Sequence, residues 1–182
     1  MGIMLDPVLG VLIGACVALL FASAALHKLR DPARFREIVR AYRALPAGAE
    51  RLAPLVPLTE LAVAAGLLVA PLRPLAASLG VLVLLGYAAA IAVNLARGRG
   101  DLDCGCGAGP AARPIAPWMI GRNLILALLL MVTLAPWQLR PFAATDAVTV
   151  GAGLAVATLL YASLDRLLGR LAPRTALLRG PR

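Results

Sequence analysis

Long apolar stretches alternate with short charged connections along this chain. A helix needs about 20 apolar residues to cross the hydrocarbon core of a bilayer, and five stretches reach or approach that length. The predicted spans are residues 8–29, 54–70, 75–96, 118–137 and 142–164. The second is the shortest, contains Glu60 and is bracketed by Pro54, Pro57 and Pro71. The pattern therefore predicts an all-α fold, a polytopic transmembrane helix bundle of about five spans.

A different pattern follows the first span. Apolar residues recur there at helical spacing against a basic opposite face: Phe35, Ile38, Val39, Tyr42 and Leu45. Asp31 followed by Pro32 is typical of a helix start, because the carboxylate caps the first turn and proline fits its first position. We expect an amphipathic helix that lies on the membrane surface, with a solvated linker as the alternative.

Composition supports the membrane assignment. Hydrophobic residues make up 61% of the chain and charged residues 15%, and mean hydropathy is +0.87. The net charge of +9 lies mainly outside the apolar stretches, so it favours contact with lipid headgroups rather than with nucleic acid. We divide the chain into a four-helix membrane core, residues 8–139, and an additional C-terminal span with a basic tail, residues 140–182.

The distribution of Lys and Arg predicts the orientation in the cell membrane. Fifteen of these residues lie in the connections on one side of the five spans and two on the other, and Arg122 lies inside a span. Because cationic residues are enriched in cytoplasmic connections, the N-terminus is expected outside and the C-terminus in the cytoplasm. This places the loop of residues 97–117 on the cytoplasmic side.

Several polar residues are predicted to meet at one end of the bundle. Glu60 and Arg122 lie about six and four residues from the starts of their spans, so both are expected roughly 6 to 9 Å below one membrane face. A charge in the membrane is costly, and we expect these two to pair. Further polar side chains converge there: His27, Lys28, Asn94 and Asn123. The alternative is that they only hold helices together or extend to headgroups.

Two of the three cysteines, Cys104 and Cys106, flank Gly105 in the loop at that end. A zinc or iron–sulfur centre normally needs four Cys or His ligands, and this chain has three cysteines and one histidine in all. Because Cys16 is expected about 20 Å along its helix from the loop end, the four cannot meet and no metal site is expected. A Cys-Gly-Cys pair can close a strained, exchange-competent disulfide ring. A structural disulfide or inactive thiols are the alternatives, while Cys16 is interpreted as a small buried hydrophobic residue.

Five segments form a recognisable ordered pattern: HKLRDPARF (27–35), YRALP (42–46), PLTELAVAAGLL (57–68), NLARGRGDLDCGCG (94–107) and GRN (121–123). With them the chain resembles the MauE family of methylamine-utilisation membrane proteins, and more distantly DoxX-like proteins, over roughly residues 8–135. The most specific part consists of Asn94, Arg97, Gly98, Asp103, Cys104, Gly105, Cys106, Arg122 and Asn123. An aromatic residue common in the family is replaced by Ala108.

The resemblance implies a role in maturing the disulfide-rich small subunit of methylamine dehydrogenase, together with a thioredoxin-like partner. It thus implies a thiol–disulfide oxidoreductase with Cys104 and Cys106 as the reacting pair. A lipid-soluble quinone is a candidate electron partner by analogy with four-helix disulfide-forming enzymes. This role implies thiols on the oxidising side, whereas the charge count places them inside. A non-catalytic accessory subunit and a small-solute transporter are the competing functions.

Overall fold

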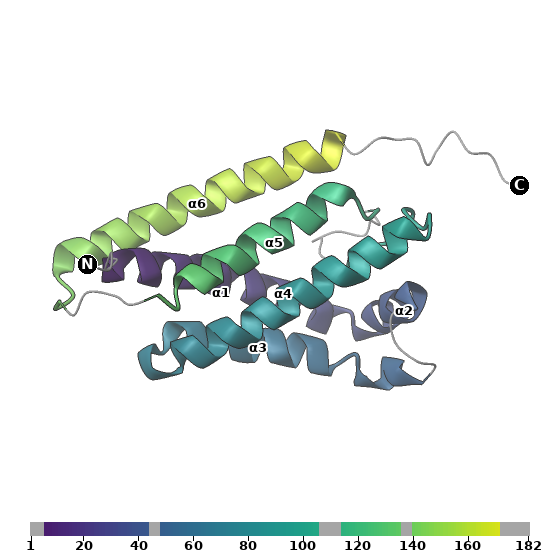
Figure 1. Ribbon diagram of the computed structural model, residues 1–182, viewed down its shortest axis with the longest axis horizontal. Helices are drawn as coiled ribbons and strands as arrows, with labels where there is room; N and C mark the ends of the chain where they lie inside the picture. Colours follow the sequence, from purple (N-terminus) through teal and green to yellow (C-terminus); the bar gives the residue numbers. More distant parts are fainter. Residues whose placement is uncertain (1–5, 44–47, 106–113, 136–139, 172–182) are drawn as a thin grey trace, which may run out of the picture.

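The computed structural model describes residues 6–43, 48–105, 114–135 and 140–171, and the elements in these ranges are all helices. The α-helices are α1 (Pro7–Arg30), α2 (Pro32–Tyr42), α3 (Leu55–Leu68), α4 (Arg73–Ala96), α5 (Pro117–Val132) and α6 (Ala144–Leu171) (Figure 1). Two short 3-10 helices, η1 (Ala49–Leu52) and η2 (Ala70–Leu72), precede α3 and α4. The prediction of an all-α fold is confirmed.

Four helices form the core of the bundle. Helix α1 packs against α3 and α5, and α4 packs against the same two helices, so the four close into a ring. Each helix contributes buried side chains to one apolar core: Val17, Phe21, Val63, Leu67, Ala77, Leu84, Ala127 and Leu130. In this ring α3 and α5 lie diagonally opposite each other, which decides the partners of the charged residues described below.

Small residues allow the helices of the ring to approach closely. A Cβ atom at Gly80 would lie 2.7 Å from Cδ1 of Leu130, and one at Gly66 would lie 2.7 Å from Cβ of Ala76. Close packing of this kind is typical of membrane helices, whose association depends on van der Waals contact because lipid tails are as apolar as the helices.

The outer surface of the bundle is apolar. Four segments are long and apolar enough to cross a membrane: Pro7–Arg30, Glu50–Leu68, Ala70–Ala96 and Ala144–Leu167. Helix α5 is also apolar but shorter, with 16 residues. It ends at Val132, five residues before the end of the predicted span 118–137. At this helix end the Thr133 hydroxyl donates to the Leu130 carbonyl at 2.6 Å. These helices imply a lipid bilayer as their surroundings.

Helix α6 lies on the outside of the ring along α1 (Figure 1). Its Gly153 faces Leu12, since a Cβ atom there would lie 3.0 Å from Cδ2 of Leu12. At the start of both helices Arg140 joins two carboxylates, with 3.0 Å from Nη2 to Oδ1 of Asp6 and 2.6 Å from Nη1 to Oδ2 of Asp146. This ion-pair network holds the first turn of α6 beside the start of α1.

The predicted convergence at one end of the bundle is present. The C-terminal ends of α1 and α4, the N-terminal end of α5, and α2 lie together at one end (Figure 1). We call this the loop end, because it carries the described parts of the connection between α4 and α5, residues 97–105 and 114–116. The helix predicted after the first span is α2. Asp31 caps its first turn as predicted, because Oδ1 accepts a hydrogen bond from the Arg34 backbone N–H at 3.0 Å.

Candidate functional site

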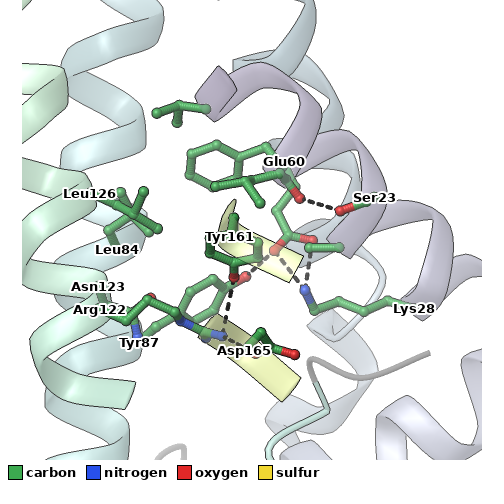
Figure 2. A pocket seen from close by; sticks show the side chains of 14 residues that line it. Ser23, Lys28, Glu60, Leu84, Tyr87, Arg122, Asn123, Leu126, Tyr161 and Asp165 are labelled. Atoms are coloured by element: carbon green, nitrogen blue, oxygen red, sulfur yellow. Dashed lines mark hydrogen bonds and ion pairs between the residues drawn. The ribbon is translucent and has the colours of Figure 1, made fainter. Parts of the chain in front are cut away.

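A buried ion pair lies between α1 and α3 near the loop end. The Lys28 ammonium donates to both carboxylate oxygens of Glu60, with Nζ–Oε distances of 2.6 and 2.8 Å (Figure 2). The two side chains are 6% and 0% exposed, so the pair is removed from solvent and lipid. The Tyr87 hydroxyl of α4 donates a third hydrogen bond to Oε1 of Glu60 at 2.6 Å. The carboxylate therefore connects three helices.

Two aromatic rings complete the surroundings of Lys28. Its Nζ lies 5.4 Å from the centroid of the Tyr87 ring and 5.7 Å from that of Phe35. Both distances permit a cation–π attraction, which is stronger where water is excluded. Phe35 is the buried residue of α2, so the cation also helps to hold α2 on the end of the bundle.

The predicted pairing of Glu60 with Arg122 is wrong. Arg122 contacts α6 instead, with 3.8 Å from Nη1 to Oδ1 of Asp165 and 3.4 Å from Nη1 to the Tyr161 hydroxyl (Figure 2). Its guanidinium also lies 5.5 Å from the centroid of the Trp118 ring. The physical reason is the bundle order: α3 and α5 are diagonal, whereas α1 is adjacent to α3 and places Lys28 beside Glu60.

Both ion pairs line one cavity of about 130 Å³ (Figure 2). Its wall combines polar and apolar side chains from α1, α3, α4, α5 and α6. The polar lining residues are Ser23, Lys28, Glu60, Tyr87, Arg122, Asn123, Tyr161 and Asp165. Although Glu60 and Arg122 do not pair, the structure brings them to the same cavity.

The two predicted asparagines have different environments. Asn94 is fully buried, and its side chain donates from Nδ2 to the Ala90 carbonyl and accepts from Nη1 of Arg99 at 2.9 Å. Arg99 also donates to the Ala41 carbonyl of α2, so this pair links the end of α4 to α2. Asn123 is 3% exposed and lines the cavity, and its Nδ2 has no hydrogen-bond partner within the described part of the chain.

His27 and Arg97 lie at the loop end but do not line the cavity. His27 is half-buried on α1 and is not among the residues that line the cavity. Arg97 is exposed and follows the last turn of α4, where its backbone N–H donates to the Val93 carbonyl. The geometry therefore separates these two side chains from the cavity that holds Lys28, Glu60 and Arg122.

The loop with the first thiol is held by α2. Oδ2 of Asp103 accepts from Nη2 of Arg34 at 2.7 Å, and Oδ1 accepts from the Gly105 backbone N–H at 3.1 Å. This hydrogen bond with the Asp103 carboxylate raises the pKa of the Arg34 guanidinium, which stays charged. Gly105 has φ +67°, and a Cβ atom there would lie 3.3 Å from Cδ1 of Ile38 on α2.

Cys104 is half-buried at the loop end and packs on a small apolar cluster. The buried members of this cluster are Ile91, Ile115 and Met119, and Trp118 lies against them as well. The backbone hydrogen bond from Ile115 N–H to the Leu102 carbonyl, 2.9 Å, brings the two ends of the loop together. Cys106 lies outside the described residues. Within the described ranges no group of three His, Cys, Asp or Glu side chains is placed to hold a metal ion.

Sequence reasoning did not single out four residues of this region: Arg34, Tyr87, Tyr161 and Asp165. A signal for two of them was present, because Tyr161 and Asp165 are four residues apart and therefore share one face of a helix. Tyr87 is a polar aromatic residue inside an otherwise apolar span. Arg34 carried no comparable signal, since it is one of three arginines in α2.

Comparisons with known proteins agree with the sequence motifs. The family described as "Methylamine utilisation protein MauE" matches residues 6–138. The methylamine utilization protein MauE of Paracoccus denitrificans is 39% identical over 162 residues, which cover 88% of this chain and 87% of the relative. That of Paracoccus versutus is 38% identical and covers 96% of each chain. That of Methylophilus methylotrophus is 35% identical, with 90% and 88% covered. No solved structure matches. The chain therefore belongs to the MauE family.

Proposed function

We propose that this chain is a membrane thiol–disulfide exchange protein of methylamine utilisation, in which Cys104 and Cys106 exchange a disulfide with a thioredoxin-like partner. The observation that carries the proposal is the position of Cys104 on a loop beyond the helix ends, beside Gly105 with φ +67°. A soluble protein can reach such a loop, whereas it cannot reach Cys16 within α1. The names of the MauE relatives are the basis for including methylamine utilisation in the proposal.

The chemistry requires one thiolate and one disulfide. In the reducing direction, the thiolate of one loop cysteine attacks a partner disulfide and forms a mixed disulfide, releasing a partner thiolate. The second loop thiolate then attacks the mixed disulfide, which leaves a Cys104–Cys106 disulfide and a reduced partner. The reverse sequence oxidises the partner. The short ring closed across one glycine is strained and therefore suited to exchange rather than to permanent cross-linking.

Contacts of α2 with the loop support this role. Arg34 holds Asp103, and Ile38 lies against Gly105, so the backbone on both sides of Cys104 is held in place. A fixed thiol loses less conformational freedom when it forms a mixed disulfide with a partner. The exposed side of α2 remains basic and is available to an acidic partner surface or to headgroups.

The test is capture of the mixed disulfide in cells that express the full chain. Cys104→Ser and Cys106→Ser should each trap a partner through the remaining loop thiol, and the variant that traps more identifies the attacking cysteine. Cys16→Ser is the matched control and should trap as the native chain does. Acid-quenched alkylation followed by non-reducing gels reads out the redox state.

If neither loop variant captures a protein, and the pair keeps one redox state in reducing and oxidising growth, the thiols are structural. The accessory-subunit function then replaces the exchange function.

A further inference from the structure

Exposed arginines are concentrated at the loop end of the bundle. Four of them lie on four different elements, and we call these four the arginine belt: Arg30 at the end of α1, Arg51 in η1, Arg97 directly after α4 and Arg166 near the end of α6. Within the part of the chain that the structure describes, their side chains form no hydrogen bond or ion pair. Their charges are therefore available to a partner outside the chain.

The opposite end of the bundle uses its cations differently. Among the described residues it has two arginines, both half-buried. Nε of Arg73 donates to the Leu67 carbonyl at 3.1 Å, and Arg140 lies between the carboxylates of Asp6 and Asp146. Cations at that end thus have partners within the protein, whereas the arginine belt is left for an external one.

Exposed apolar side chains place the arginine belt at the edge of the hydrocarbon core. One or two turns before three of its members, on the same helix face, lies a large exposed apolar residue: Leu26, Val93 and Leu159. The fourth member, Arg51, is followed by the exposed Leu52 and Leu55. Because an arginine stem lies along apolar surface while its guanidinium reaches the polar layer, each member is placed to contact lipid phosphates.

The net charge of this end favours anionic lipids over zwitterionic ones. Among the described residues, three exposed carboxylates lie here, Asp31, Glu37 and Asp101, and three exposed arginines in or just after α2 offset them, Arg36, Arg40 and Arg43. The four charges of the arginine belt remain as an excess. Guanidinium groups suit phosphate oxygens, since they donate two parallel hydrogen bonds to them.

We infer that the arginine belt binds the phosphate groups of anionic phospholipids. Its members come from elements on different sides of the bundle, so the bound lipids hold the loop end at the level of the headgroups. The loop with Cys104 lies at the same end, and its depth is fixed with it. Lipid binding of this kind does not depend on thiol exchange.

The test is native mass spectrometry of the full chain, released from micelles that contain phosphatidylglycerol and phosphatidylcholine in equal amounts. The first bound lipid should be phosphatidylglycerol about fivefold more often than phosphatidylcholine, the ratio expected for one arginine near an anionic headgroup. Replacing the whole belt with glutamine should bring this ratio to about one: Arg30→Gln, Arg51→Gln, Arg97→Gln and Arg166→Gln. Lysine at the same four positions keeps the charges and should keep most of the preference.

Arg73→Gln, at the opposite end, is the matched control and should bind lipids as the native chain does. Cys104→Ser combined with Cys106→Ser should also keep the native ratio, because the arginine belt contains no cysteine. Failure of thiol capture therefore removes only the proposed function. No preference in the native chain, or an equal preference in the glutamine variant, overturns the inference and leaves these arginines to water or to an acidic protein surface. Thermal unfolding of each variant confirms that it is folded.

Discussion

The Lys28 ammonium and the Glu60 carboxylate form an ion pair inside the bundle, with 2.6 Å between Nζ and Oε1. The pair joins two adjacent helices, α1 and α3, and Tyr87 adds a donor from α4. Two charges removed from solvent are stabilised only when each has the other, since an isolated buried charge keeps its full desolvation cost. The relative positions of these three helices are therefore coupled through one carboxylate.

Replacing either partner alone should destabilise the fold strongly. Lys28→Met and Glu60→Gln each leave one buried charge unpaired, at a cost of about 3–5 kcal/mol, while the double variant should recover much of that loss. Thermal unfolding of the purified protein in detergent measures all three. Lys28→Met combined with Arg140→Gln, at the opposite end of the bundle, is the control and should be additive. Additive losses for Lys28 and Glu60 as well would show that the two are not coupled.

Two glycines of α4 offer a matched comparison of helix packing. Gly80→Ala places a Cβ atom 2.7 Å from Leu130 Cδ1 and 3.2 Å from Val63 Cγ1, both in the core, so it should destabilise by about 1–3 kcal/mol. Gly86→Ala has no atom within 4 Å of the new Cβ and should stabilise by about 0.5–1 kcal/mol through helix propensity. Unfolding temperatures of the two variants should move in opposite directions. A shift of equal sign contradicts the close packing of α4 and α5 at Gly80.

The helices and their approximate depths could be predicted from sequence, because both depend on local properties. Apolar length sets a span, and the Asp31–Pro32 start of α2 depends only on neighbouring residues. Depth along a helix also follows from residue count, and Glu60 and Arg122 do reach one cavity. The rotation and order of the helices depend on packing between distant segments, which a pattern of apolar residues does not specify.

Asp165 illustrates the same limit at the site. The sequence predicts the last span as an addition to a four-helix core, and this prediction gives no reason to pair its acidic end with Arg122. The structure places α6 along α1, and Asp165 and Tyr161 thereby reach the cavity between α1 and α5. Lys28 was predicted to belong to the polar end, but its partner depended on α1 being adjacent to α3.

The hydrogen bond between Arg34 and Asp103 should control access to the first thiol. Arg34→Gln removes the charge that holds the loop, so Cys104 should be alkylated several times faster by maleimide. The measurement uses a background with serine at Cys16 and Cys106, which leaves one reactive thiol. Arg36→Gln is the matched control, because Arg36 is exposed on the same helix. Equal alkylation rates in the native background, Arg34→Gln and Arg36→Gln would mean that α2 does not restrain the loop.

Orientation in the membrane decides which compartment the loop end faces. If α1, α3, α4, α5 and α6 all cross the bilayer, the start of α1 and the end of α6 lie on opposite sides, and the end of α6 lies on the same side as the loop end (Figure 1). The excess of Lys and Arg on that side predicts a cytoplasmic C-terminus. A green fluorescent protein fused after Arg182 should therefore fluoresce, and alkaline phosphatase fused there should be inactive.

Phosphatase fused after Leu72, in the turn between α3 and α4, is the control and should be active, because this turn lies at the opposite end of the bundle. Activity after Arg182 together with inactivity after Leu72 would reverse the orientation and place Cys104 on the outer side. Many arginines of the loop end belong to α2, whose Phe35 is buried and whose Arg34 is engaged with Asp103. Arginines that hold α2 in place add to the number of cationic residues on that side of the membrane, whether or not they determine the orientation of the chain. The fusion pair therefore tests whether the charge distribution reflects topology or the attachment of α2 to the thiol loop.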